Sequence, residues 1–190
     1  MNRAGFILVG GKSSRMGRDK ALLPYRGTVL VSWIAREVET VTGTVTLVGA
    51  PDRYASLGRH VIADSRPGCG PLAGIEAALR YSSADWNVIV ACDMPGVTAA
   101  LLENLLIQAA EQDCDCLLPV GARGFPEPLC AVWHVRSLAA LRSALDSNVR
   151  KITDAVGSLR VVHAPSTGLG WAVNVNTPAE WQSHLMAVSE

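Results

Sequence analysis

A short segment near the N-terminus, residues 8–20, contains the residue types that bind phosphate groups. It reads Leu-Val-Gly-Gly-Lys-Ser-Ser-Arg-Met-Gly-Arg-Asp-Lys and follows an apolar run. Adjacent glycines let the backbone approach a ligand closely, and hydroxyl and cationic side chains bind phosphate oxygens. The residues that could do so are Gly10, Gly11, Ser13, Arg15 and Lys20. This chemistry suits a triphosphate, and the alternative is a surface glycine turn whose charges are solvated.

Two common nucleotide-binding motifs do not fit the spacing of this segment. A Walker loop needs a glycine five positions before Gly11, the first residue of the Gly-Lys-Ser triplet, and that position is Phe6. A dinucleotide fingerprint needs a second glycine two positions after Gly10, and that residue is Lys12. The sequence therefore predicts a phosphate-binding loop of another kind.

An aspartate follows the most continuous apolar run of the chain. Asp93 comes shortly after residues 86–91 and just before Pro95. Ligands of open α/β sheets bind at the carboxyl ends of the strands, and Mg²⁺ prefers one or two carboxylates together with substrate phosphates. We therefore predict that Asp93 is a Mg²⁺ ligand, and the alternative is an aspartate that only caps the following turn.

A second aspartate, Asp64, follows another short apolar run. The residues after it, 68–75, read Gly-Cys-Gly-Pro-Leu-Ala-Gly-Ile and lead into a predicted helix with Pro71 at its first position. The free N–H groups at the start of that helix could bind an anion or the polar edge of a base.

The elements that must position these residues alternate along the chain. We predict strands at residues 5–9, 44–48, 60–63, 86–91, 129–135 and 160–163, and helices at 28–41, 71–81, 98–112, 137–145 and 151–156. Strands that alternate with helices in this way imply right-handed crossovers and a mostly parallel sheet. The predicted fold class is α/β, a three-layer Rossmann-like arrangement with helices on both faces of the sheet.

The chain is predicted to form one domain over residues 1–190. A nucleotide-binding half would span about residues 1–115, and a less regular acceptor-binding half about residues 116–190. The last helix is expected to start near Thr177, because a Thr-Pro-Ala-Glu capping box begins there.

The composition excludes several classes of protein. The 17 Lys and Arg residues balance the 17 Asp and Glu residues, which argues against nucleic acid or an anionic membrane as a partner. Six of the cationic residues lie within residues 1–27, against one aspartate, so an anion is expected to bind there. The five scattered cysteines indicate reduced thiols, and the apolar run of residues 4–9 is too short for a membrane span. We expect a cytoplasmic protein.

The first loop resembles a known family. Residues 8–24, with the pattern Leu-x-Gly-Gly-x-Ser-x-Arg-Met-Gly-x-Asp-Lys-x-Leu-Leu-Pro, resemble the signature loop of the molybdenum cofactor guanylyltransferases, a branch of the nucleotidyltransferases. The resemblance implies a nucleotidyltransferase fold in which Leu8, Val9 and Gly10 lie against the base and sugar of GTP. It also implies that Arg15 and Lys20 hold the phosphates and that Asp93 binds Mg²⁺, which makes these three the catalytic residues.

The resemblance extends over nearly the full chain. It implies that Asp64 and Gly70 contact the nucleotide and that the paired amides Asn174 and Asn176 lie near the pterin substrate or the metal. From the residues alone, those two amides could equally make local cap hydrogen bonds. Related cytidylyltransferases carry a Gly-Met-Gly-x-Ser-Leu segment where this chain has Gly-Pro-Leu-Ala-Gly, which favours guanine. The sequence departs from many family members at residues 48–51, where they have an asparagine near the base.

The reaction implied by the resemblance is transfer of GMP from GTP to the terminal phosphate of molybdopterin or Mo-molybdopterin, with release of pyrophosphate. Other cofactor-assembly proteins and molybdoenzyme apoproteins would be further partners. The same motifs also fit transfer from CTP to the same pterin, or from GTP to another phosphorylated metabolite. A non-catalytic cofactor carrier is a third alternative, which the combination of Arg15, Lys20, Asp64 and Asp93 disfavours.

Overall fold

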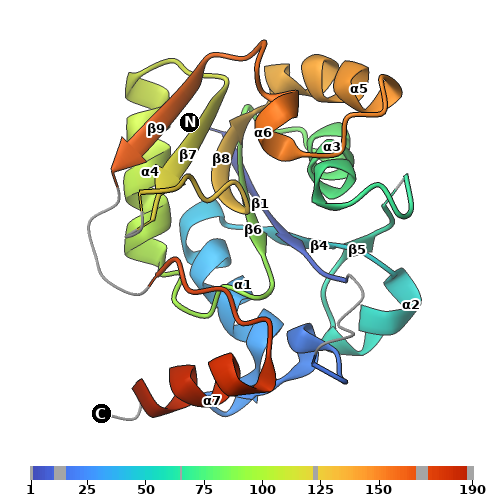
Figure 1. Ribbon diagram of the computed structural model, residues 1–190, viewed down its shortest axis with the longest axis vertical. Coiled ribbons are helices and arrows are strands. Elements are labelled where there is room, and N and C mark those ends of the chain that lie inside the picture. The colour runs from blue at the N-terminus through green and yellow to red at the C-terminus, as the bar shows by residue number, and fades with distance from the viewer. Residues whose placement is uncertain (1, 11–15, 65, 122–123, 166–170, 188–190) are drawn as a thin grey trace.

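A mixed sheet of seven strands forms the centre of the described part of the chain (Figure 1). The computed structural model describes residues 2–10, 16–64, 66–121, 124–165 and 171–187. In spatial order, the strands are β5 (Val61–Ile62), β4 (Val45–Val48), β1 (Arg3–Leu8), β6 (Trp86–Ala91), β8 (Cys130–His134), β7 (Cys116–Val120) and β9 (Val161–Pro165).

The sheet is mostly parallel, as predicted. Strand β1 pairs in parallel with both β4 and β6, β4 pairs in parallel with β5, and β7 pairs in parallel with β9. Strand β8 is antiparallel to both of its neighbours, β6 and β7. The other six strands therefore all run in one direction, and their carboxyl ends meet at one edge of the sheet.

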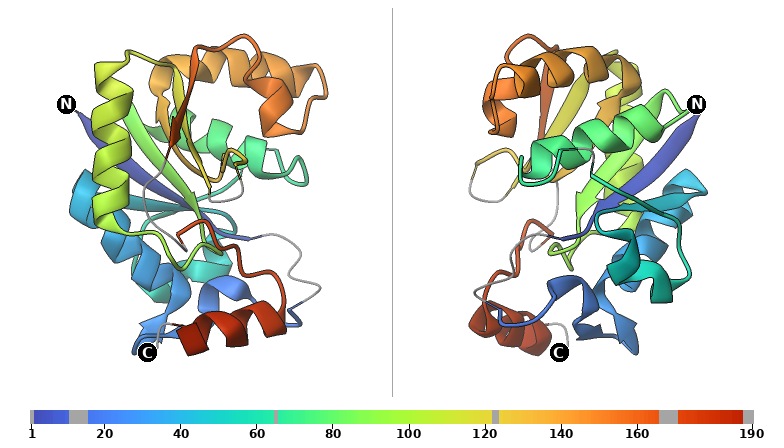
Figure 2. Two further views of the ribbon diagram at one scale, coloured as in Figure 1. Left: turned by 60° about the vertical axis from the view of Figure 1, so that its left-hand side comes forward. Right: turned by 90° about the vertical axis from the view of Figure 1, so that its right-hand side faces the viewer.

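Helices cover both faces of the sheet (Figures 1 and 2). Helices α1 (Leu30–Thr42) and α4 (Ala99–Glu111) cover one face, and α3 (Pro71–Tyr81), α5 (Leu138–Asp146) and α6 (Ile152–Ala155) cover the other. The three-layer α/β prediction is confirmed. The remaining helices are α2 (Pro51–Tyr54), α7 (Pro178–Ala187) and the 3-10 turns η1 (Lys20–Leu22), η2 (Ala55–Leu57) and η3 (Val135–Ser137). None of the helices in the described residues is long and apolar enough to cross a membrane.

The central strands are buried on both faces, which explains their continuous apolar runs. All six residues of β6 are buried. Val88 and Val90 pack in the core beneath α1 and α4, whereas Ile89 packs in the core beneath α3 and α5.

The helix predicted from residue 28 begins two residues later, and a small hairpin takes the place of its first turn. Strand β2 (Pro24–Tyr25) pairs antiparallel with β3 (Thr28–Val29). The two residues between them, Arg26 and Gly27, have φ of 46° and 78°. Positive φ at both central positions is the requirement of a tight hairpin turn, so residues 28–29 continue as a strand.

The predicted capping box at the last helix is confirmed. Glu180 Oε2 accepts hydrogen bonds from the backbone N–H groups of Asn176 at 2.6 Å and Thr177 at 2.9 Å, and Thr177 Oγ1 accepts from Glu180 N at 3.2 Å. The bond from Asn176 is the main cause of the lowered pKa of Glu180. The start of α7 is thus fixed next to Asn176.

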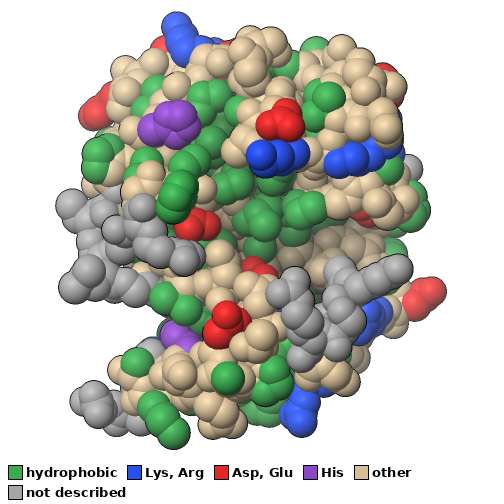
Figure 3. All heavy atoms as spheres, viewed as in Figure 1, with side chains coloured by type: hydrophobic (Ala, Val, Ile, Leu, Met, Phe, Trp, Pro, Cys, Tyr) green, Lys and Arg blue, Asp and Glu red, His purple; other side chains and the backbone are tan. Residues whose placement is uncertain are grey.

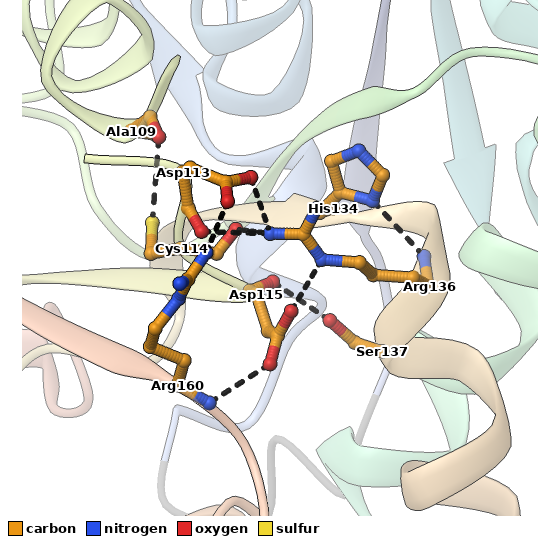
Figure 4. A network of polar contacts seen from close by, with 8 residues as sticks. All are labelled: Ala109, Asp113, Cys114, Asp115, His134, Arg136, Ser137 and Arg160. Carbon is orange, nitrogen blue, oxygen red and sulfur yellow. Dashed lines mark hydrogen bonds and ion pairs between the residues drawn. The ribbon is translucent and has the colours of Figure 1, made fainter. Parts of the chain in front are cut away.

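A network of charged residues joins three strands at the edge of the sheet where the parallel strands begin (Figure 4). The Arg136 side chain donates to Asp115 Oδ1 and, at 3.0 Å, to Asp113 Oδ1. The backbone N–H of Arg160 donates to Asp115 Oδ2 at 2.8 Å, and the Ser137 hydroxyl donates to the Asp115 carbonyl at 2.7 Å. Asp115 therefore connects the start of β7 to the end of β8 and the start of β9.

The carboxylates of this network are held in their charged form. Hydrogen bonds from Arg136 and then Arg160 lower the pKa of Asp113. Burial alone would raise the pKa of Asp115, but the hydrogen bonds from the Arg160 amide and the Arg136 side chain outweigh it, and the net direction is also down. A carboxyl whose pKa is lower in the folded state stabilises the fold above its unfolded pKa, and this stabilisation is lost as the pH falls through the folded value.

Asp115→Asn is expected to lower the free energy of unfolding by about 1–2 kcal/mol at pH 7, because one charged acceptor of a partly exposed network is lost. The difference from the wild type should shrink as the pH falls below about 4, where the carboxyl becomes protonated in the unfolded chain, and should go on shrinking until the pH passes the lower pKa of the folded state. Urea unfolding at pH 7 and at pH 3 measures both values. Asp154→Asn, which removes a 3.9 Å contact with Lys151, is the control and should change little. An equal loss for Asp115→Asn at both pH values would contradict this account.

Candidate functional site

A cavity opens at the edge of the sheet where β1, β4 and β6 end. Its volume is about 640 Å³, within the range of small-molecule sites. In the space-filling view, the surface is hollowed between the part that carries α3 and α5 and the part that carries α7, and apolar side chains gather there (Figure 3). The residues that line the cavity are Leu8, Val9, Gly10, Asp19, Lys20, Val48, Gly49, Asp64, Gly68, Gly70, Pro71, Gly74, Ala91, Cys92, Asp93 and Leu129.

Several residues in the wall of this cavity are glycines, and two of them are in close contact with neighbouring elements. A Cβ on Gly49 would lie 2.3 Å from the Val9 carbonyl oxygen, so only glycine fits there without a backbone shift. A Cβ on Gly74 of α3 would lie 3.1 Å from Leu8 Cδ2. Gly10 has φ of 115°, a conformation that favours glycine. Gly49 and Gly74 therefore let the end of β1 pack closely against the end of β4 and against α3 at the wall of the cavity.

A lysine, an aspartate and an asparagine meet beside the cavity. Lys20 Nζ lies 2.6 Å from Asn176 Oδ1 and 3.4 Å from Asp93 Oδ2. The Lys20 and Asp93 side chains are 16% and 21% exposed. The backbone N–H of Val175 donates to the Asp93 carbonyl at 2.9 Å, and the Val175 side chain is fully buried. This bond fixes the segment before α7 against the end of β6, with Asn176 facing Lys20.

Asp93 has an oxygen that is suited to bind a cation. Its Oδ1 is buried and makes no hydrogen bond to any described residue. A buried carboxylate oxygen without a donor is costly unless a ligand satisfies it. Asn176 Oδ1 is a second oxygen atom close by, reached through the shared contact with Lys20. Mg²⁺ prefers oxygen ligands of these types, so the residues present fit the metal.

Asp64 lies at the other side of the cavity. Its Oδ1 accepts a hydrogen bond from the backbone N–H of Arg66 at 2.8 Å. Burial raises the pKa of Asp64, the Arg66 bond partly opposes this, and Glu76 adds a smaller upward contribution. The remaining acceptor capacity of Asp64 is available to N–H or O–H groups of a ligand.

Cys92 also lines the cavity but is not suited to be a nucleophile. Burial, and then the charges of Asp93 and Asp19, raise the pKa of Cys92 to about 12. The thiolate is the reactive form, and at neutral pH Cys92 is a thiol. Its contribution is packing.

Comparison with protein-family models decides the family. The description "MobA-like NTP transferase domain" matches residues 5–161. The chain belongs to this family. Membership confirms the prediction of a nucleotidyltransferase enzyme and the resemblance of the first loop.

Relatives of this MobA-like transferase match it over nearly the whole chain. A probable molybdenum cofactor guanylyltransferase of Carboxydothermus hydrogenoformans is 33% identical, covering 96% of this chain and 95% of the relative. One of Synechococcus elongatus is 31% identical and covers 96% and 98%.

Solved structures agree with the fold. The molybdopterin-guanine dinucleotide biosynthesis protein A of Archaeoglobus fulgidus has a TM-score of 0.84 at 28% identity, covering 98% of each chain. A CMP:2-keto-3-deoxy-manno-octonic acid synthetase has a TM-score of 0.74 at 14% identity over both full chains, and shares the fold.

The structure of the MobA-like transferase brings most of the predicted site residues together. Those that line the cavity are Leu8, Val9, Gly10, Lys20, Asp64, Gly70 and Asp93. Asn176 joins them through Lys20, whereas Asn174 is not among the lining residues. Gly11, Ser13 and Arg15 lie outside the described residues.

Asp19 and Gly49 are two of the cavity residues that were not predicted from the sequence. Asp19 lines the cavity next to Lys20 and bonds to side chains of α2. Gly49 forms part of its wall. The sequence pointed to this segment only because residues 48–51 lack the asparagine that many family members have there. Both roles depend on contacts with residues distant in the sequence.

Proposed function

We propose that the protein transfers GMP from GTP to the terminal phosphate of molybdopterin, or of its molybdenum-loaded form, and releases pyrophosphate. The observation that carries this proposal is the cluster of Lys20, Asp93 and Asn176 beside a glycine-walled cavity. The relatives that match nearly the whole chain are probable molybdenum cofactor guanylyltransferases, which supports guanine and the pterin as substrates.

The nucleotide would occupy the cavity with its base between the ends of β1 and β4 and the start of α3. Leu8, Val9 and Gly10 would lie against the base and sugar, and Asp64 and the backbone near Gly70 would provide polar contacts. The phosphates would then extend toward Lys20, and the phosphate-binding group would be completed by Gly11, Ser13 and Arg15. The placement of Lys20 on the Asp93 side of the cavity supports this direction.

Asp93 would hold Mg²⁺ through its free Oδ1, with Asn176 Oδ1 as an adjacent oxygen. Bound there, the ion neutralises negative charge on the phosphate oxygens of the nucleotide. Lys20 must then release Asp93 Oδ2 and Asn176 as its ammonium turns to the phosphates. The charge and contacts of Lys20, Asp93 and Asn176 would therefore change together when the nucleotide and the metal bind.

The protein needs no nucleophile or general base of its own. The attacking group is the terminal phosphate of the acceptor, which is already anionic at neutral pH. What remains for the chain is to align this phosphate in line with the leaving pyrophosphate and to stabilise the charge that develops on it. Lys20 and Arg15 would provide that stabilisation as cationic donors, and Cys92 has no part in the chemistry.

The acceptor would approach from the half of the chain after residue 116. Leu129, at the start of β8, reaches the cavity, and Asn176 reaches Lys20. The amides of Asn174 and Asn176 can donate to and accept from the polar edge of a pterin. We therefore assign residues 1–115 to the nucleotide and residues 116–190 to the acceptor, within one domain.

A competition experiment tests the proposal. Purified protein, Mg²⁺ and Mo-molybdopterin are mixed with equal GTP and CTP, and the products are identified by mass. The guanine dinucleotide and pyrophosphate are expected, and addition of EDTA should stop their formation. The cytosine dinucleotide would overturn the assignment of the base. Tight binding of GTP without any dinucleotide would overturn the assignment of the acceptor or the enzymatic function.

A further inference from the structure

Asp19 is a second aspartate in the nucleotide cavity, and both of its carboxylate oxygens are occupied. Its Oδ1 accepts a hydrogen bond from the backbone N–H of Ala21 at 3.1 Å. Its Oδ2 accepts from the Tyr54 hydroxyl at 2.9 Å and lies 2.8 Å from Arg53 Nε. The Asp19 side chain is 11% exposed. This residue is therefore held from two directions, by its own turn and by α2.

The two aspartates of the cavity differ in a way that separates their roles. Asp93 has an oxygen to which none of the described residues donates, whereas Asp19 has a donor on each oxygen. Asp93 is therefore the better placed of the two carboxylates to bind a metal ion. The Arg53 guanidinium also balances the Asp19 charge, so that a carboxylate can remain in a cavity for anions. Asp19 is thus arranged to hold protein atoms in place.

What Asp19 holds on one side is the backbone that carries Lys20. Asp19 is the N-cap residue of η1, and its bond to Ala21 N is the cap hydrogen bond. Lys20 is the first residue of that turn. The cap therefore sets the direction in which the Lys20 side chain leaves the main chain.

What Asp19 holds on the other side is α2, which follows the Gly49 wall of the cavity. Tyr54 is fully buried, and burial followed by the hydrogen bond to Asp19 raises the pKa of its hydroxyl. The hydroxyl therefore stays protonated and donates to Asp19. Because Tyr54 cannot move within the core, it provides a fixed point for the turn that carries Lys20.

We propose that Asp19, anchored by Tyr54 and Arg53, is a positioning residue that fixes the main chain of Lys20 so that the ammonium can reach the triphosphate. This inference rests on the proposed function, because it requires phosphates at Lys20. It predicts that Asp19 affects the part of the binding that depends on phosphates and leaves the binding of the base and sugar unchanged.

The test compares two ligands and two substitutions. Dissociation constants for GTP and for guanosine are measured by displacement of a fluorescent guanine nucleotide in Mg²⁺ buffer. Asp19→Ser keeps an N-cap acceptor but is too short to reach Tyr54, and Tyr54→Phe removes only the hydroxyl. Asp19→Ser is expected to weaken GTP binding by about tenfold, and Tyr54→Phe by a few-fold, with guanosine binding unchanged. Asp52→Asn, on the exposed side of α2, is the matched control and should bind both ligands as the wild type does.

A double-mutant cycle separates positioning from a general structural role. If Asp19 acts through Lys20, Asp19→Ser should cause no further loss of GTP affinity in a Lys20→Met background. A full tenfold loss in that background, a parallel loss of guanosine affinity, or wild-type GTP affinity in both Asp19→Ser and Tyr54→Phe would overturn the inference. A wild-type protein that binds GTP no more tightly than guanosine would instead overturn the proposed function.

Discussion

Asp93→Asn is expected to reduce the rate of guanylyl transfer by about 10²–10³-fold, because the variant keeps the size of the side chain but loses the charge that holds the metal. The free Oδ1 of Asp93 is the observation behind this expectation. The rate is measured as pyrophosphate release over a range of Mg²⁺ concentrations. The loss should be partly relieved at high Mg²⁺ if the main defect is metal affinity.

The binding of guanosine separates the expected defect from misfolding. The proposed function places Asp93 beside the phosphates and away from the base, so Asp93→Asn should bind guanosine as tightly as the wild type. Asp52→Asn serves as a second control and should retain the full rate, since Asp52 lies on the exposed surface of α2. If Asp93→Asn transferred GMP at the wild-type rate, the assignment of the metal to this residue would be wrong.

Lys20→Met should weaken GTP binding and reduce the transfer rate together, by about 10²-fold in kcat/KM, because a desolvated cation on the phosphates is lost. Lys20→Arg should not restore the rate. The ammonium fits between Asn176 Oδ1 and Asp93 Oδ2, and a planar guanidinium has a different size and hydrogen-bond geometry. Steady-state kinetics with GTP as the varied substrate measures both variants.

A second measurement on Lys20→Met should show a gain, in the affinity for a divalent cation, where the first shows a loss of GTP affinity and rate. In the absence of nucleotide, the ammonium lies between the Asp93 carboxylate and Asn176 Oδ1, the two groups that would bind the metal, so it competes with a divalent cation. Its removal should therefore increase the affinity of the nucleotide-free protein for Mn²⁺, measured by electron paramagnetic resonance. Weaker or unchanged Mn²⁺ binding in Lys20→Met would show that the lysine and the metal do not share these oxygen atoms.

The predictable part of the fold is the part in which burial alone decides the sequence. Strands β1 and β6 are covered on both faces, and only continuous apolar runs satisfy that environment. The hairpin before α1 could not be predicted in the same way. Its turn depends on positive φ at Arg26, and a non-glycine residue gives little sign of that conformation in the sequence.

In the site, too, the sequence predicts residues whose place follows from the strand pattern and misses those whose place depends on tertiary contacts. Asp93 and Asp64 could be predicted because the carboxyl ends of parallel strands meet at one edge. Asp19 and Gly49 could not, because Asp19 meets Tyr54 across 35 positions and Gly49 is required by the Val9 carbonyl. For Asn176 the sequence left a cap or a ligand as equal alternatives, and its contact with Lys20 is a tertiary one.

The hydrogen bond between Lys20 and Asn176 joins residues that are 156 positions apart. During synthesis at about 5–20 residues per second, Asn176 is made roughly 8–30 seconds after Lys20. Strands β1, β4 and β6 can meet well before that time, so a growing chain can form the walls of the nucleotide cavity early. The Lys20 ammonium then lacks the Asn176 amide as a partner until residue 176 has emerged from the ribosome. Under the proposed function, turnover would therefore begin only at the end of this interval, and a chain that stops short of residue 176 would have the walls of the cavity without the contact between Lys20 and Asn176.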